Sequence, residues 1–292
     1  MNTAYIQKIE MIKFLREFMS GQGATEVFTP ITRKSSCDSI KRVKTEYDTY
    51  LRNCQEMHLR IMMQYYDDVF EIGPSFRRES VEDDLHGREF TLCEAQFKER
   101  SLNFLMNILK TIISTFRKDI SFEEISVAQR IHHLLGINIS SEGEEALVNC
   151  LKKRYPDFKF EQSFQLVNHF IQMEIEPLSL GKAVFFTEYP SCTLSLARYK
   201  DESKETVQRF ECFINGIEIS NGYENSINID EFVERNKKVD MFTMEEEYLE
   251  KYLRNGLVPS DTSIIGIGVE RLCMIIYNIT DIQGLLHENC VF

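Results

Sequence analysis

Two neighbouring stretches decide the fold: FEIGPSFRRES at residues 70–80 and HGREFTLCEAQF at residues 86–97. Each contains a strand-like run, Val69 to Ile72 in the first and Glu89 to Phe97 in the second. The link from Arg77 to Arg88 is highly charged, and such a composition is costly to bury. We therefore expect two strands whose connection faces solvent or a ligand.

These strands carry side chains that suit a nucleotide. Arg77 offers a planar guanidinium to an α-phosphate and to a carboxylate under attack. Phe90 can stack on a purine ring, and Glu79 and His86 can bond the adenine or the outer phosphates. The alternative is a salt-bridged surface hairpin, since exposed ion pairs are common and weak.

A second polar cluster follows in GIEISNGYEN, residues 216–225. Glu218 and Asn221 project near one another from a strand and its end, and Glu211 in RFE is a third candidate on a neighbouring strand. Oxygen ligands of this kind suit Mg²⁺ bound to nucleotide phosphates. Taken alone, such residues are more often the polar side chains of an edge strand.

A third cluster is GIGVERL, residues 266–272. Its glycines let the backbone approach a ligand closely. Arg271 begins an apolar helix and can reach a γ-phosphate. A glycine bend in a packed strand with a capping charge is the alternative.

The rest of the chain predicts one α/β (α+β) domain over residues 1–292, with a mixed, mostly antiparallel sheet flanked by helices. Its strands do not alternate with single helices, as a doubly wound parallel sheet requires. A mainly helical insertion is expected at about 119–180, and residues 32–52 form a loop-rich connection that leaves open whether it closes over the site. The other predicted helices are at 4–20, about 55–66, 101–117 and 230–254.

Composition excludes several classes of function. The formal net charge of −12 argues against a large nucleic-acid surface. The eight cysteines include no closely spaced pair of the zinc-binding kind, so free thiols are expected. No apolar stretch reaches the roughly 20 residues that span a bilayer. The start of the sequence shows no basic region followed by an apolar one, so we expect no signal peptide and a cytoplasmic location.

In order and combination, these segments resemble the three signature motifs of class II aminoacyl-tRNA synthetases. EVFTP, ending at Pro30, resembles the first, which lies at the family's dimer interface and implies a homodimer. FRRES…HGREFT resembles the second, and GIGVERL the third, with Glu270 in place of the frequent Asp. EYPSCTLSLAR (188–198) and RFECFINGIEISNGYEN resemble lysyl-tRNA synthetases and their short paralogues, the elongation factor P lysyltransferases. The likeness covers about residues 8–290 and leaves no room for an anticodon-binding domain.

The resemblance implies ATP and Mg²⁺ as ligands, with Arg77 and Arg271 as catalytic residues and Glu211 and Glu218 on the metal. One contact on the adenine side departs from the family, because Gly87 replaces the Asn that normally follows His86. The positions that match the family's ATP and magnesium residues are Arg77, Glu79, His86, Phe90, Glu218, Asn221 and Arg271.

The resemblance also implies an amino-acid pocket. Glu56, in CQEMHLR, matches the residue that holds the substrate's α-amino group. Glu94 matches the carboxylate that grips the lysine ammonium. Asn221 belongs to the same pocket, and Gly266 keeps the small residue of lysyl-tRNA synthetases.

Two residues of that pocket differ from the family. Gln96 stands where a Tyr is expected, and Asn225 stands where a Glu is expected, although neighbouring Glu224 can compensate if the loop shifts by one residue. An amide in place of a carboxylate removes a charge-assisted hydrogen bond worth about 1.5–3 kcal/mol. The pocket should therefore hold an ordinary lysine ammonium less well.

Together these features predict an ATP-dependent ligase that forms an aminoacyl adenylate from a small amino acid other than ordinary L-lysine. The acyl group would pass to a small molecule or a protein lysine. Charging of tRNA is the less favoured alternative, because it needs a basic surface. A catalytically silent regulatory paralogue is a third reading, which the retained motif residues disfavour.

Overall fold

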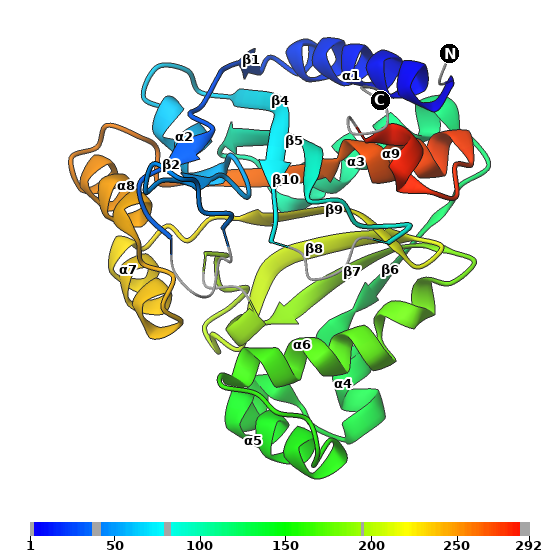
Figure 1. Cartoon of the computed structure of the whole chain (residues 1–292). Helices are drawn as coiled ribbons and strands as arrows, with labels where there is room; N and C mark the ends of the chain where they lie inside the picture. Colours follow the sequence, from blue (N-terminus) through cyan, green and yellow to red (C-terminus); the bar gives the residue numbers. More distant parts are fainter. Residues whose placement is uncertain (1–2, 37–41, 79–82, 194–195, 287–292) are drawn as a thin grey trace.

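The computed structural model describes residues 3–36, 42–78, 83–193 and 196–286, and an eight-stranded sheet forms its centre (Figure 1). The β1–β4 and β6–β7 pairs are parallel, and the other neighbours are antiparallel, which confirms the predicted mixed sheet. The strands, in spatial order, are β1 (Thr25–Glu26), β4 (Val69–Phe76), β5 (Glu89–Lys98), β10 (Thr262–Gly268), β9 (Ile217–Glu224), β8 (Thr206–Ile214), β7 (Ala183–Pro190) and β6 (Phe122–Ser126).

Helices cover both faces of this sheet (Figure 1). One face packs against α1 (Thr3–Gly21), α3 (Leu102–Phe116) and α9 (Val269–Tyr277). The core on the other face includes side chains from α2 (Glu56–Met62), α4 (Val127–Leu135), α5 (Ile139–Arg154), α6 (Ser163–Glu174), α7 (Ile229–Lys238) and α8 (Met244–Arg254), with α5 packed on α4 and α6, and α7 packed on α8. No helix in the described part of the chain is long and apolar enough to cross a membrane.

The alternation of side chains along β10 explains why there are two cores. Ile265 and Ile267 belong to the core under α1, α3 and α9, whereas Ile264 belongs to the core on the other face. Gly266 and Gly268 share the face of Ile264. At these two positions β10 therefore projects no side chain of its own on that face of the sheet.

The first core is closed by a buried ion pair between the N-terminal helix and the last long helix. Lys8 of α1 pairs with Glu270 of α9 at 2.7 Å, and both side chains are almost fully buried. Both carboxylate oxygens of Glu270 also accept from the Thr91 amide at 3.0 Å. The pair therefore fixes α1 and α9 against β5.

Three elements differ from the sequence-based expectation. The expected helical insertion opens with strand β6, because its backbone pairs with β7 from Phe122 to Ser126. The expected helix at 230–254 is two helices, since Thr243 and Glu246 form a capping box that begins α8. Residues 32–52 contain a short antiparallel pair, β2 (Thr32–Arg33) with β3 (Tyr50–Leu51).

Candidate active site

A row of paired residues crosses the middle of the sheet. Gly266 on β10 lies between Glu94 on β5 and Asn221 on β9, and Asn221 in turn pairs with Glu211 on β8. A cavity of about 290 Å³ lies over this row. Because Gly266 and Gly268 carry no side chains, they form its floor. Nine predicted residues line it: Glu56, Arg77, His86, Phe90, Glu94, Glu218, Asn221, Gly266 and Arg271.

The end of the cavity towards the start of β5 carries the residues predicted to hold a nucleotide. The guanidinium of Arg77 lies over the Phe90 ring, 5.1 Å from its centroid. The backbone amide of Arg77 donates to the Arg88 carbonyl at 2.9 Å and closes the base of the hairpin. An aromatic face and an exposed cation thus lie together, as stacking on a purine beside a phosphate requires. Glu79 falls outside the described residues.

Arg271 and Glu218 face each other across the same end. Arg271 Nη1 is 3.6 Å from Glu218 Oε2 and donates to the Glu218 carbonyl at 3.2 Å. The Asn221 amide donates to Glu218 Oε1 at 3.4 Å. These contacts are long, and the Glu218 side chain is one third exposed, so its oxygens are accessible. Glu218 and Asn221 can therefore offer oxygen ligands to a Mg²⁺ ion that also binds phosphates.

Glu211 lies apart from the cavity floor. Its carboxylate accepts from the Tyr189 hydroxyl at 2.7 Å and from Arg209. It lines a neighbouring cavity of about 420 Å³ that shares Glu218 and Arg271 with the first. In the described ranges, no group of three or more His, Cys, Asp and Glu side chains has the geometry of a metal site. Glu218 is thus better placed than Glu211 as a metal ligand.

The hairpin connection brings His86 to the mouth of the cavity. His86 Nδ1 lies 2.7 Å from Asp83 Oδ1, and both side chains are a little less than half exposed. The following residue, Gly87, packs closely against Leu286, because a Cβ there would lie 2.7 Å from Leu286 Cδ1 and 3.2 Å from the Glu89 carbonyl oxygen. A larger residue at this position requires these neighbours to shift, so the packing favours glycine over the Asn that the family resemblance leads one to expect.

The opposite end of the cavity holds two carboxyl groups. Glu94 Oε2 accepts from the Gln55 amide at 2.5 Å, and Glu56 accepts from the Tyr223 hydroxyl. Burial raises the pKa of Glu94 to about 8 and that of Glu56 to about 7. Both carboxyls therefore favour a ligand that brings a positive charge or a hydrogen-bond donor.

Gln96 and Asn225 do not line the cavity. Both are fully buried behind its wall, where the Asn225 amide donates to Gln96 Oε1 at 3.2 Å and to Thr262 Oγ1 at 3.0 Å. Arg60, also buried, places Nη1 3.4 Å from Asn225 Oδ1. A guanidinium is thus already present beside the position where the family resemblance leads one to expect a carboxylate.

Glu224 does not take the place of that carboxylate. Its Oε1 accepts from the Leu102 amide at 2.8 Å, at the start of α3, and its Oε2 pairs with Arg198 at 3.1 Å. Both oxygens are therefore occupied on the other side of the strand.

Sequence reasoning missed several residues that line the cavity. Tyr223 and Arg209 face it from paired positions on β9 and β8. The strand pattern could have predicted both residues. Each lies two residues along its strand from a predicted site residue and therefore projects from the same face of the sheet. Asn53 and Cys54 also line the cavity from the turn before α2, and no motif indicated them.

Comparison with known proteins finds a matching family and several similar sequences. The family model described as tRNA synthetases class II (D, K and N) matches residues 1–287. Lysine–tRNA ligases from Mycoplasma genitalium and Saccharolobus solfataricus are 26% and 27% identical to this chain over 98% and 94% of its length. The enzyme of the same name from Buchnera aphidicola is 29% identical over 95% of the chain.

The chain spans slightly less than two thirds of the length of these relatives, from 61% to 64%. The family model nevertheless covers almost the whole chain, and the sheet and its flanking helices match the class II catalytic fold. Both the fold and the lysyl-tRNA synthetase-like resemblance predicted from the sequence are confirmed. The chain therefore belongs to the family of class II tRNA synthetases (D, K and N).

Proposed function

We propose that the chain is an ATP-dependent amino acid ligase that forms an aminoacyl adenylate. One observation carries the proposal: a single cavity has Arg77, Phe90 and Arg271 at one end and Glu56 and Glu94 at the other. The first end suits a purine and its phosphates, and the second suits an amino acid's ammonium groups. The two reactants would thus meet over the glycine floor.

In the proposed reaction, the amino-acid carboxylate attacks the α-phosphorus of ATP in line, and pyrophosphate leaves. Arg77 and Arg271 stabilise the charge that spreads over the phosphates, and Glu56 orients the α-amino group. Glu218 and Asn221 would hold Mg²⁺, which neutralises phosphate charge when bound. Little covalent chemistry is required of the protein, so positioning accounts for much of the rate.

The amino acid is proposed to be one other than ordinary L-lysine. Support comes from the amide pair of Gln96 and Asn225, which is buried behind the wall and bonded within itself. The Arg60 guanidinium beside that pair disfavours a second positive charge there. A side chain that ends at Glu94, with a smaller or less basic polar group, fits these neighbours better.

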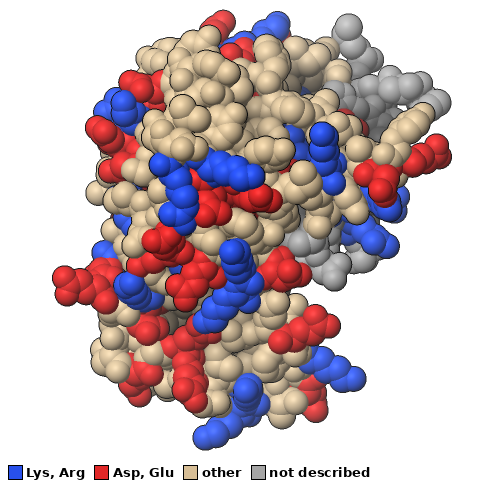
Figure 2. Space-filling model, turned by 90° about the vertical axis from the view of Figure 1, so that its left-hand side faces the viewer, with Lys and Arg blue, Asp and Glu red and all other residues tan. Residues whose placement is uncertain are grey.

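The acceptor is proposed to be a small molecule or a protein lysine. The formal charge of −12 supports this, since a tRNA surface is usually basic. On the described part of the face that carries α7 and α8, acidic and basic side chains are interspersed and no broad basic patch is visible (Figure 2). Arg254, for example, pairs with both Asp230 and Glu250.

Charging of tRNA is the second candidate. It is favoured by the relatives at 24–29% identity, which are lysine–tRNA ligases. A charging assay with total tRNA separates the two proposals, because only this second candidate predicts acid-precipitable aminoacyl-tRNA.

The same proposal has three further parts. They are a homodimer, a single domain over residues 1–292 with its mainly helical insertion, and a cytoplasmic location. Support for the dimer comes from Phe28 and Ile31, which are 81% and 43% exposed beside β1. Covering these apolar side chains would remove them from water. Buried free thiols at Cys93, Cys212 and Cys273 are in keeping with a reducing compartment.

ATP–pyrophosphate exchange tests the central proposal. The purified chain, with ATP and Mg²⁺, is offered the twenty standard amino acids and a set of diamino and amide analogues. Exchange with one of them, slowed about 10²–10³-fold by Arg271→Ala, is the expected result. A strong preference for L-lysine would refute the proposed amino acid but not the reaction. No exchange with any amino acid, from a folded sample, would favour a silent paralogue.

A further inference from the structure

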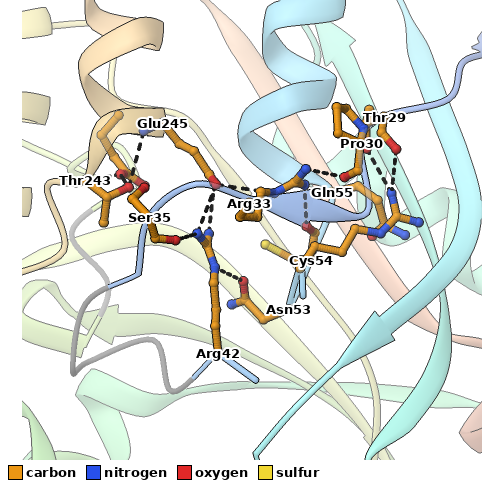
Figure 3. Close-up of polar contacts among 12 residues, drawn as sticks. Thr29, Pro30, Arg33, Ser35, Arg42, Asn53, Cys54, Gln55, Thr243 and Glu245 are labelled. Carbon is orange, nitrogen blue, oxygen red and sulfur yellow. Dashed lines mark hydrogen bonds and ion pairs between the residues drawn. The ribbon is translucent and has the colours of Figure 1, made fainter. Parts of the chain in front are cut away.

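A buried carboxylate on α8 holds two arginines from the connection that precedes α2 (Figure 3). Glu245 accepts from Arg42 through two parallel hydrogen bonds, each of 2.9 Å. The Nε of Arg33 lies 3.3 Å from Glu245 Oε1. All three side chains are less than one tenth exposed, so this ion cluster is screened little by solvent.

The same two arginines contact the turn at residues 53–54. Arg42 Nε donates to Asn53 Oδ1 at 3.1 Å, and Arg33 Nη2 donates to the Cys54 carbonyl at 3.2 Å. Each guanidinium therefore joins Glu245 to a different residue of the turn. Figure 3 shows Arg42 and Arg33 reaching from Glu245 towards Asn53 and Cys54.

This turn forms part of the wall at the amino-acid end of the cavity. Asn53 and Cys54 line the cavity, and so does Glu56, the first residue of α2. Between them, the Gln55 amide donates to Glu94 at 2.5 Å. A shift of the turn would move Glu56 and release Glu94 together.

We infer that Glu245 is a positioning residue for the amino-acid pocket, acting through Arg42 and Arg33 on the turn at residues 53–56. The inference rests on the proposed function, since it assigns the turn to the amino-acid half of the reaction. Glu245 itself does not line the cavity and touches no proposed substrate. Its effect passes through the two guanidinium groups.

The neighbouring Arg52 holds the chain before the turn in place, so we expect Glu245 to affect only the residues after Arg52. Arg52 pairs with Glu71 at 2.7 Å and donates to the Pro74 carbonyl at 2.7 Å, so β4 anchors the chain just before the turn. The hinge for any movement therefore lies after Arg52. Loss of Glu245 should disturb residues 53–56 while β4, the Arg77 hairpin and the nucleotide end keep their positions.

Steady-state kinetics test this division. In Glu245→Gln, the KM of the best amino acid in pyrophosphate exchange should rise about 10–100-fold, as expected for misplaced binding groups. The KM of ATP should stay within about twofold of wild type, because only one half of the site moves. The conservative Glu245→Asp should recover part of the loss. Equal changes in both KM values would overturn the inference.

The matched control is Glu247→Gln on the same helix. Glu247 is exposed and pairs with Lys251 at 2.8 Å, one turn along α8. The control removes one carboxylate from α8 without touching Arg33 or Arg42. Both KM values should match wild type. A rise in the amino-acid KM of this control would show that the effect comes from the charge of the helix, and would refute a role for Glu245.

A second variant tests whether a raised amino-acid KM results from unfolding instead of from a displaced turn. The triple substitution Arg33→Met, Arg42→Met and Glu245→Met replaces the whole buried ion cluster by apolar side chains, a change that is often neutral for stability. Its melting temperature should lie near wild type, yet its amino-acid KM should remain raised, because Asn53 and Cys54 have lost their donors. A wild-type KM in this folded triple variant would contradict the inference.

Hydrogen exchange separates this inference from the proposed function. The amides of residues 53–57 should exchange at least about tenfold faster in Glu245→Gln than in wild type or Glu247→Gln. If the wild type activates no amino acid, the proposed function fails while this readout still reports on the turn. Unchanged exchange in Glu245→Gln would overturn the positioning role, whatever the activity.

Discussion

The two ends of the cavity differ in how tightly the protein holds its own charged groups. At the nucleotide end, Arg77 is exposed, and Arg271 makes only contacts of 3.2 Å or longer. At the amino-acid end, Glu94 is buried and bonded at 2.5 Å, and Glu56 is bonded to Tyr223. The nucleotide end is solvated, whereas the amino-acid end is desolvated and preorganised.

This contrast distinguishes residues that affect only the reaction from residues that also affect folding stability. Solvated arginines contribute little to folding, since exposed ion pairs are weak. Buried carboxyls affect folding through their protonation, because burial penalises the charged form. Substitutions at the nucleotide end should therefore change activity alone, while those at the amino-acid end should change stability, pH dependence and selectivity.

The largest effect is expected from Arg271→Ala. Loss of one donor to the reacting phosphates should lower the pyrophosphate-exchange rate about 10²–10³-fold. The folding free energy should fall by less than about 2 kcal/mol, because the hydrogen bonds that are lost are long. Exchange kinetics and urea unfolding measure both quantities. Arg254→Ala on α8 is the control, and a large stability loss in Arg271→Ala would break the contrast.

The second prediction concerns pH. Burial raises the pKa of folded Glu94 to about 8, whereas the carboxyl of the unfolded chain has its ordinary pKa of about 4.5. Unfolding therefore releases a proton in this window, and Glu94 makes stability fall as pH rises from about 5 to 8, by up to about 1.4 kcal/mol per pH unit. Urea titrations at several pH values should show a flatter profile for Glu94→Gln. Glu247→Gln should keep the wild-type slope, and an equally steep Glu94→Gln profile would contradict the prediction.

The third prediction is that Asn225→Glu shifts the preference of the pocket towards L-lysine. The new carboxylate would lie beside Arg60 and restore a charge near Gln96. We expect the specificity constant for L-lysine to rise about tenfold relative to the preferred substrate, because the new carboxylate offsets the positive charge of Arg60 behind the pocket wall. Competition between the two amino acids in the exchange assay measures it. Asn225→Ala is the control. An equal rise in the specificity constant for L-lysine there would show that the effect comes from the change in side-chain size and not from charge.

The smallest effect is expected from Gly266→Ala. The added Cβ would lie 3.5 Å from Glu94 Oε1 and 3.9 Å from Asn221 Oδ1, which are ordinary contacts. The fold should tolerate it, and the amino-acid KM should rise roughly fivefold, the low end for one methyl group in a pocket. The ATP KM should not change. A loss of ATP binding instead would show that the two ends are not independent.

Much of this arrangement was predictable from the sequence. The strand pair containing Phe90 and Glu94 followed from its apolar pattern and charged connection. The alternation of side chains placed Phe90 and Glu94 on one face. Strand β6 was missed, because FEEIS has few apolar residues and is held by pairing with β7.

Other features could not be predicted, since they depend on docking between distant segments. Glu245 meets Arg42 across 203 residues of sequence. Gln96 and Asn225 were expected in the pocket, but their burial behind its wall depends on how α2 brings Arg60 against β9. Glu211 was expected on the metal, but Tyr189 and Arg209 occupy its carboxylate.

The sequence alone determined the family, the strands that carry the three motifs and the face on which their side chains lie, because these follow from motif order and the two-residue period of a strand. Only the tertiary structure decided which carboxyls are desolvated, which amides bond to each other and which arginines share a partner. Burial and pairing depend on strand register and helix packing, and these bring together residues that no local pattern connects.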